Sequence, residues 1–225
     1  MNIEQARFNM VEQQIRTWDV LDQAVLDMLF KVKREDFVPA AYRNLAFVDM
    51  EIPLGAGEGE RAAMMMAPKM EARIVQAVSP QPGEHALEIG TGSGYLAALL
   101  AHQAQVVHSI EIVDSLSRAA AVALAKARVG NVRCHVGDAA QSAVAFVGEE
   151  KFDVIVLSGS VPMVPQAYLD KLNVKGRLFA VVGDAPVMEA TLFTRLSETA
   201  VTATKIFETV LTPLTNALQP SRFTF

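Results

Sequence analysis

The sequence predicts a doubly wound α/β domain with a mainly parallel sheet, preceded by a helical extension. Three observations predict this fold class. From residue 70 onward, short apolar segments alternate with helical segments, which is the pattern of βαβ units. A glycine-rich loop follows the first of these apolar segments. Residues 1–69, in contrast, have helix-like apolar spacing and irregular stretches without such alternation.

Composition places the chain among ordinary globular proteins. It has 225 residues, a formal net charge of -5 and 51% hydrophobic residues, so we expect a single domain over 1–225. The acidic balance argues against nucleic acid as a partner. Cys134 is the single cysteine and cannot form an internal disulfide. Because there is no signal peptide pattern and no apolar run of roughly 18–20 residues, we expect a cytoplasmic protein without a membrane partner.

The helical extension, 1–69, also carries the loop that we expect on the acceptor side of a site. Apolar residues recur at helical spacing over 3–30, with a break where Thr17 or Asp19 is expected to cap a second helix. A shorter turn and helix is expected over 39–47. Glycines at positions 55, 57 and 59 then mark a loop.

The core, 70–185, begins with a helix over 70–78 that stops before two prolines. Strands are predicted over 85–90, 106–112, 131–138, 152–159 and 177–183, and helices over 94–104, 119–127 and 169–172. Gly176 is expected to turn the chain before the fifth strand. In the remaining segment, 186–225, two strands over 191–197 and 205–212 are expected to pair antiparallel.

The most informative segment is LEIGTGSGY, which joins the first core strand to a helix. Glycines at alternate positions permit a tight turn and close approach of a ligand to the backbone. In open α/β sheets, ligands bind beyond the carboxyl ends of the strands. A plain strand–helix turn without a ligand is the alternative, but four strand ends carrying suitable residues disfavour it.

The spacing of this loop distinguishes between two cofactor classes. A dinucleotide fingerprint reads GxGxxG, whereas the third glycine here, Gly94, comes one residue early. Glu88 before the loop and an acid about 20 residues further on, Glu111, suit S-adenosylmethionine, with Glu88 near its ammonium and Glu111 on its ribose hydroxyls. Asp138 is expected near the adenine amine and Ser158 near the sulfonium. The predicted cofactor residues are Glu88, Gly90, Thr91, Gly92, Ser93, Gly94, Glu111, Ile112, Gly137, Asp138 and Ser158.

These residues belong to a set of motifs that resembles a known family. The chain resembles the protein-L-isoaspartate O-methyltransferases in MVEQQIR at 10–16, REDFVP at 34–39, IPLG at 52–55, LEIGTGSGY at 87–95 and FDVIVLSGSVPMVP at 152–165. The resemblance implies a Rossmann-like sheet that binds S-adenosylmethionine. It also implies methyl transfer to the free carboxylate of isoaspartyl residues in damaged proteins.

One position departs from the family pattern. Where the family has T-I-S-x-P, with a serine at the methyl-transfer site, this chain reads MMMAP, so Met66 occupies the serine position. Met66, Ala67 and Pro68 are therefore the candidate catalytic, acceptor-side residues. Either Arg61 or Lys69 supplies the missing donor, or the acceptor is a different, small or apolar molecule.

Other chemistries have weaker support. No histidine has the spacing of a metal ligand set, so His108 and His135 are interpreted as structural and no metal is expected. The serines lack an accompanying His–Asp arrangement, which disfavours a nucleophilic hydrolase. Three hypotheses follow from the sequence: an isoaspartyl methyltransferase, a methyltransferase with another acceptor, and a non-catalytic protein that binds S-adenosylmethionine.

Overall fold

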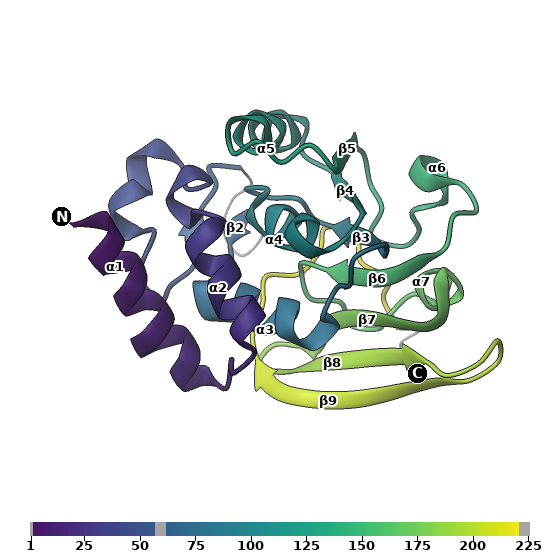
Figure 1. Cartoon of the computed structure of the whole chain (residues 1–225). Helices are drawn as coiled ribbons and strands as arrows, with labels where there is room; N and C mark the ends of the chain where they lie inside the picture. The colour runs from purple at the N-terminus through teal and green to yellow at the C-terminus, as the bar shows by residue number, and fades with distance from the viewer. Residues whose placement is uncertain (1, 57–61, 221–225) are drawn as a thin grey trace.

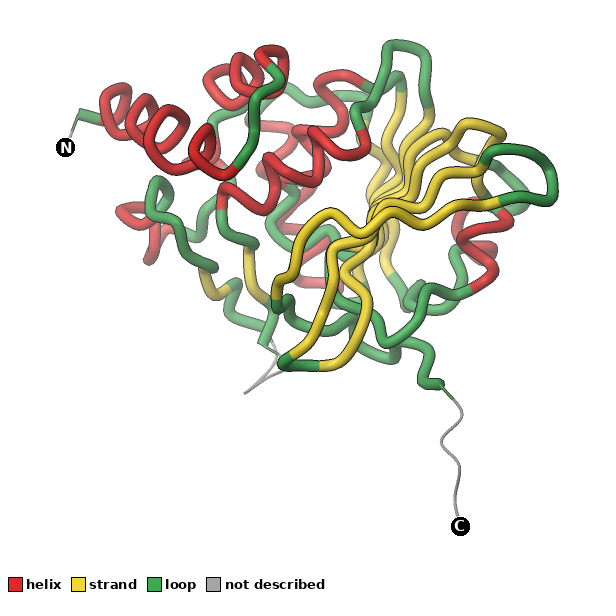
Figure 2. Tube along the Cα trace, turned by 90° about the horizontal axis from the view of Figure 1, so that it is seen from below, coloured by secondary structure: helices red, strands yellow, loops and turns green. Residues whose placement is uncertain are grey.

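The computed structural model describes residues 2–56 and 62–220. Its centre is a seven-stranded sheet in the order β5-β4-β3-β6-β7-β8-β9 (Figures 1 and 2). The first five strands in this order are parallel, whereas β8 and β9 run antiparallel to their neighbours. Strands β4 and β5 extend the sheet to one side of β3, and β6 continues it on the other side. The β3/β6 boundary is therefore the topological switch point.

The elements follow the predicted alternation. The core strands are β3 (His85–Ile89), β4 (Val106–Glu111), β5 (Val132–Val136), β6 (Phe152–Leu157), β7 (Leu172–Asp184), β8 (Val187–Arg195) and β9 (Val201–Thr209). The core helices are α3 (Pro68–Val78), α4 (Tyr95–Gln103), α5 (Asp114–Lys126), α6 (Val144–Val147) and α7 (Gln166–Asp170). Two short strands, β1 (Ile52–Pro53) and β2 (Met64–Met65), pair antiparallel ahead of the core. Among the described residues, no helix has the length and apolar composition needed to cross a bilayer.

Side-chain alternation along β3 separates two hydrophobic cores. Leu87 and Ile89 contribute to one core, with residues of β6 and α7, whereas Ala86 contributes to the other, with residues of α3 and α4. Because successive strand residues point to opposite faces, Glu88 points toward α3 and α4. The Glu88 carboxylate is therefore buried between the sheet and these helices, next to the site described below.

The amino-terminal extension packs on the α3/α4 side of the sheet (Figure 1). It comprises α1 (Ile3–Asn9), a π-helical segment over Met10–Ile15, a 3-10 turn over Arg16–Trp18 and α2 (Gln23–Lys31). The expected break is present, but the predicted cap is wrong. Asp22 is the N-cap, and its side chain accepts a hydrogen bond from the Ala24 N–H. Asp19 instead adopts φ 60°, which is incompatible with capping a helix directly after it.

Several details differ from the sequence prediction: α5 begins at Asp114 rather than at 119, and α6 was not predicted. The short helix α7 covers Gln166–Asp170 rather than 169–172, and Leu172 already belongs to β7. Gly176 lies within the bounds of β7, and the chain turns locally there: Lys175 has φ 71° and the pairing with β6 shifts register. The carbonyl of Asn173 would lie 2.8 Å from a Cβ at Gly176, so this irregularity requires glycine. The predicted antiparallel pair at the end of the chain is confirmed as β8 and β9.

Candidate active site

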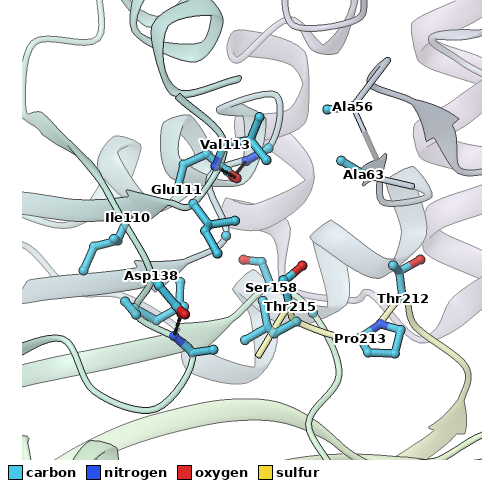
Figure 3. A pocket seen from close by; sticks show the side chains of 18 of the residues that line it. Ala56, Ala63, Ile110, Glu111, Val113, Asp138, Ser158, Thr212, Pro213 and Thr215 are labelled. Carbon is cyan, nitrogen blue, oxygen red and sulfur yellow. Dashed lines mark hydrogen bonds between the residues drawn. The ribbon is translucent and has the colours of Figure 1, made fainter. Parts of the chain in front are cut away.

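A cavity of about 470 Å³ lies beyond the carboxyl ends of β3, β4, β5 and β6. This is the edge of a doubly wound sheet at which ligands bind. Leu54, Ala56 and residues 62–64 border the cavity on one side, and Thr212–Thr215 border it on another (Figure 3). The strand ends therefore form one side of the cavity, and two segments outside the predicted cofactor motif form its other sides.

The glycine loop forms the turn between β3 and α4. Gly90, Gly92 and Gly94 have φ values of 96°, 54° and 83°, a region that favours glycine. A Cβ at Gly94 would lie 3.1 Å from the Cβ of Ala120, so a side chain here would crowd α5. The N–H of Gly92 donates to Glu111 and that of Gly94 donates to the Thr91 carbonyl. These two groups thus stabilise the loop itself.

Glu111 ends β4 and reaches the cavity wall (Figure 3). One carboxylate oxygen accepts the Gly92 N–H at 2.9 Å and the other accepts the Val113 N–H at 2.9 Å. A carboxylate oxygen accepts more than one hydrogen bond, so each oxygen keeps capacity for a ligand. Two backbone donors fix the carboxylate in one orientation before any ligand arrives.

Asp138 follows β5 and is held by two groups. The Ala140 N–H donates to its Oδ1 at 3.0 Å, and the Asn216 side-chain amide donates to its Oδ2 at 2.7 Å. Asn216 belongs to the segment after β9, which crosses the strand ends. Ser160, three residues after β6, holds this segment because its N–H donates to the Thr212 carbonyl and its own carbonyl accepts from the Leu214 N–H.

Glu88 is fully buried and lies in a chain of hydroxyl groups. Its carboxylate accepts hydrogen bonds from Ser109 at 2.5 Å and from Ser158 at 3.3 Å, and Ser109 in turn lies 2.6 Å from the Thr91 hydroxyl. Burial raises the pKa of Glu88 to about 8, although the two serine hydrogen bonds oppose this shift. Glu88 is thus poised to exchange a proton near neutral pH.

A second, small cavity of about 30 Å³ adjoins the first and is lined by Met66, Glu71 and Glu88. The fully buried Arg34 forms an ion pair with Glu71, and its guanidinium also donates to the carbonyls of Met66 at 2.6 Å and Ala46 at 3.0 Å. Burial raises the pKa of Glu71 to about 7, against the opposing effect of Arg34. Arg34 therefore fixes the backbone of the Met66–Pro68 loop beside the glycine loop.

Comparison with known proteins decides the family. The profile of the protein-L-isoaspartate(D-aspartate) O-methyltransferases matches residues 5–219. A protein-L-isoaspartate O-methyltransferase of Pelobacter propionicus is 35% identical over 184 residues, which cover 82% of this chain and 83% of that protein. The chain belongs to this family. Another relative, from Gloeobacter violaceus, is 37% identical over 174 residues, covering 77% and 81% of the two chains.

Solved structures agree with the fold of this family. A Plasmodium falciparum structure of a beta-aspartate methyltransferase, in complex with S-adenosyl-L-homocysteine, has a TM-score of 0.76 at 18% identity. The match covers 96% of this chain and 99% of that chain. These comparisons confirm the predicted family, the Rossmann-like fold class and the prediction of an O-methyltransferase.

Every predicted cofactor residue lies near the strand ends of this methyltransferase fold. The larger cavity is lined by Gly90, Gly92, Glu111, Ile112, Gly137, Asp138 and Ser158, and the smaller one by Glu88, Thr91 and Ser93. Gly94 is the N-cap of α4 rather than a lining residue. Of the acceptor-side residues, Met66 lines the smaller cavity, whereas Ala67 and Pro68 begin α3.

Lys69 is not the substitute donor that the sequence allowed. Its ammonium pairs with Asp49 at 2.7 Å and lies 3.8 Å from the centre of the Trp18 ring, and it lines neither cavity. Arg61, the other alternative, lies outside the described residues, as do Gly57 and Gly59. Within residues 2–56 and 62–220, the small cavity at Met66 is lined by methionines, by two buried carboxylates and by the hydroxyl residues Thr91, Ser93 and Ser158.

The predicted structural histidines lie away from both cavities. His108 Nδ1 is 3.0 Å from His135 Nε2, and the two rings are stacked. Glu150 lies within 2.9 Å of His85. In the described parts of the chain, no group of three or more His, Cys, Asp or Glu residues is arranged to hold a metal ion.

The raised pKa of Glu88 predicts a pH-dependent stability. Between the ordinary pKa of 4.5 and the folded value of about 8, the folded state keeps a proton that the unfolded state releases. The Glu88 contribution therefore becomes less favourable as pH rises through this window. The variant Glu88→Gln cannot titrate at this position and should not show this fall in stability. We therefore expect the free energy of unfolding of the variant to rise relative to that of the wild type from pH 5 to pH 8.

Urea denaturation at several pH values measures this difference. Glu198→Gln is the control, because Glu198 is 78% exposed in its side chain and should leave the pH profile unchanged. Parallel profiles for Glu88→Gln and wild type would contradict the assignment of a buried, protonated Glu88.

Proposed function

We propose that this protein transfers a methyl group from S-adenosylmethionine to the carboxylate of isoaspartyl residues in proteins or peptides. Membership of the protein-L-isoaspartate(D-aspartate) O-methyltransferase family is the observation that carries the proposal. The S-adenosylhomocysteine bound to the Plasmodium falciparum relative supports the same choice of cofactor.

The residues of the larger cavity fit this cofactor. Its volume of about 470 Å³ lies in the range of about 300–1,000 Å³ that is usual for small-molecule sites. Ile89, Ile110 and Leu54 supply apolar walls, and Glu111 supplies an oriented carboxylate at one end. Such a carboxylate accepts hydrogen bonds from a ribose diol and disfavours a phosphate at the same position.

We assign the remaining cofactor contacts by position. Asp138, oriented by Ala140 and Asn216, would accept a hydrogen bond from the adenine amine. Glu88 would hold the ammonium group of the methionyl end, directly or through water, and this role requires loss of its proton. Ser158, which bridges toward Glu88 and lines both cavities, lies beside the expected sulfonium position.

Methyl transfer to a carboxylate requires little from the acceptor-side residues beyond orienting the acceptor. When bound, S-adenosylmethionine supplies a methyl group that is already activated by the adjacent sulfonium. An acceptor carboxylate is itself a nucleophile, so this chain needs no strong general base. Its residues instead align the acceptor and exclude water. Arg34, by fixing the Met66 carbonyl, would hold the acceptor loop in place.

Restoring the family serine gives a prediction about this loop. Met66 cannot donate a hydrogen bond, and loss of a donor in a closed site costs roughly 10²–10³ in rate when its role is electrostatic. We expect Met66→Ser to raise kcat/KM for an isoaspartyl peptide by about tenfold or more. Met66→Leu, of similar volume, is the matched control and should leave kcat/KM nearly unchanged. Equal rates for all three proteins would contradict a missing donor at this position.

A second candidate function keeps the cofactor but changes the acceptor. Met64, Ala62 and Ala63 line the larger cavity, and Met66 lines the smaller one, so the acceptor side presents apolar and adaptable side chains. A small apolar acceptor would suit these walls better than a charged peptide segment.

Labelled methyl transfer tests the proposal and separates the two candidates. The protein is incubated with labelled S-adenosylmethionine and an isoaspartyl peptide, beside the same peptide with normal aspartate. We expect transfer to the isoaspartyl form alone. If protein that binds S-adenosylhomocysteine in calorimetry transfers label to neither peptide, the isoaspartyl acceptor is wrong and the apolar acceptor is favoured.

A further inference from the structure

A third cavity, of about 630 Å³, lies at the opposite edge of the sheet from the cofactor cavity. The last turns of α2, α4 and α5 converge on it, and Asn131, directly before β5, borders it. The Asn131 amide donates to the carbonyls of Ala101 and Ala104, at 2.8 and 3.1 Å, and so fixes the end of α4 to this rim. The cavity therefore has no residue in common with the site described above.

Cations gather around this cavity although the protein is acidic overall. Lys31, Lys33, Lys126 and Arg128 line it with His102, against Asp36 as the single carboxylate of the lining. None of the four permanent cations forms an ion pair with any residue of 2–56 or 62–220. Burial, followed by the nearby charge of Lys31, lowers the pKa of His102, so Lys31 and His102 lie close together on this rim.

Helix ends explain only part of this arrangement. Cations in the last turn of a helix interact favourably with its dipole, and this accounts for Lys31, His102 and Lys126. Lys33 and Arg128 lie beyond their helices. Arg128 also has φ 59° directly after the C-cap of α5, a position at which glycine is the usual residue. Because arginine is unfavourable in this left-handed conformation, its presence at this position suggests that the Arg128 side chain has a binding role.

The wall between the cations is apolar. Val32, Ala98 and Ala101 are buried beneath the rim. Such a cavity combines a small apolar surface with several positive charges. We propose that it binds a small molecule that carries a polyphosphate group, either a nucleoside triphosphate or free polyphosphate. Four permanent cations against one carboxylate suit several negative charges better than one.

Calorimetry with guanosine triphosphate and with inorganic triphosphate tests this inference. The titrations are done in metal-free buffer with saturating S-adenosylhomocysteine, so that a nucleoside cannot report on the cofactor cavity. We expect saturable, salt-sensitive binding of at least one probe. Tighter binding of guanosine triphosphate identifies a nucleotide ligand, whereas equal binding identifies the polyphosphate group as the whole determinant. Inorganic triphosphate has no nucleoside, so its result stands even if the proposed cofactor is wrong.

Charge reversal locates the site. The double variant Lys31→Glu/Lys126→Glu should weaken binding about tenfold or more. Lys175→Glu/Lys205→Glu, with the same change in net charge on β7 and β9, should leave it within about twofold. Arg128→Gly should weaken binding while the melting temperature holds or rises, since glycine accepts this backbone conformation. Absence of saturable binding, or equal weakening by both double variants, would overturn the proposal.

Discussion

Replacing Glu111 by alanine is expected to abolish most of the affinity for S-adenosylhomocysteine. The wild-type carboxylate is fixed by the N–H groups of Gly92 and Val113 and is aimed into the larger cavity. Hydrogen bonds to a charged group contribute about 1.5–3 kcal/mol each. Loss of two such bonds to the ribose, together with the loosened loop, should weaken binding by at least about 100-fold.

A ribose analogue separates recognition from folding. Wild-type protein should discriminate strongly against S-adenosylhomocysteine that lacks the 2′-hydroxyl, whereas Glu111→Ala should bind both forms equally weakly. Glu111→Gln, which keeps the size of the side chain, should fall between the two proteins. Unchanged affinity in Glu111→Ala, measured by calorimetry, would remove the ribose assignment.

Arg34→Met is expected to destabilise the fold strongly, and more at pH 8 than at pH 5.5. Arg34 and Glu71 form a fully buried ion pair, and removing one partner of such a pair costs about 3–5 kcal/mol. The pKa of Glu71 is already raised to about 7, and loss of Arg34 raises it further. At pH 5.5 the lone carboxyl is protonated in the folded state, so the loss should be smaller there.

Chemical denaturation at the two pH values measures this effect. Arg118→Met breaks an exposed ion pair with Asp114, whose side chains are 76% and 50% exposed, and should change stability little. The double variant Arg34→Met/Glu71→Met should recover most of the loss, because no unpaired charge remains. If Arg34→Met lowers the free energy of unfolding no more than Arg118→Met does, the buried pair does not support the acceptor loop.

The sequence predicted those parts of the site that depend on local order along the chain. Gly90 and Asp138 follow strands and Glu111 ends one, and parallel strands bring their carboxyl ends to one edge of the sheet. The structure places all three on one cavity. Local spacing was therefore sufficient for these residues, whose roles toward the cofactor remain proposals.

Contacts between distant segments were not predictable in this way. Asn216 reaches Asp138 only because Ser160 anchors the segment after β9, and no sequence pattern marks that crossing. The Arg34–Glu71 pair joins the extension to α3 in the same way. The REDFVP segment that contains Arg34 was a signal of family resemblance, but it did not reveal the buried partner.

The wrong details also have local physical causes. Asp22 rather than Asp19 caps α2, because Asp19 adopts a left-handed conformation before the chain enters the helix. Gly176 was expected to turn the chain before a strand that begins at 177, since glycine commonly marks turns. The turn is present, but it lies inside β7 as an irregularity in the pairing with β6, where the chain folds back onto the Asn173 carbonyl.

The most direct test of the proposed isoaspartyl methylation is a competition between two peptides in one reaction mixture. An equimolar mixture of an isoaspartyl peptide and its aspartyl counterpart is incubated with the protein and S-adenosylmethionine, and fragment masses locate the methyl group. We predict a methyl ester on the isoaspartyl carboxylate alone, and none with Glu111→Ala at the same cofactor concentration. Equal methylation of both peptides, or of neither by protein that binds S-adenosylhomocysteine, would contradict the proposed function.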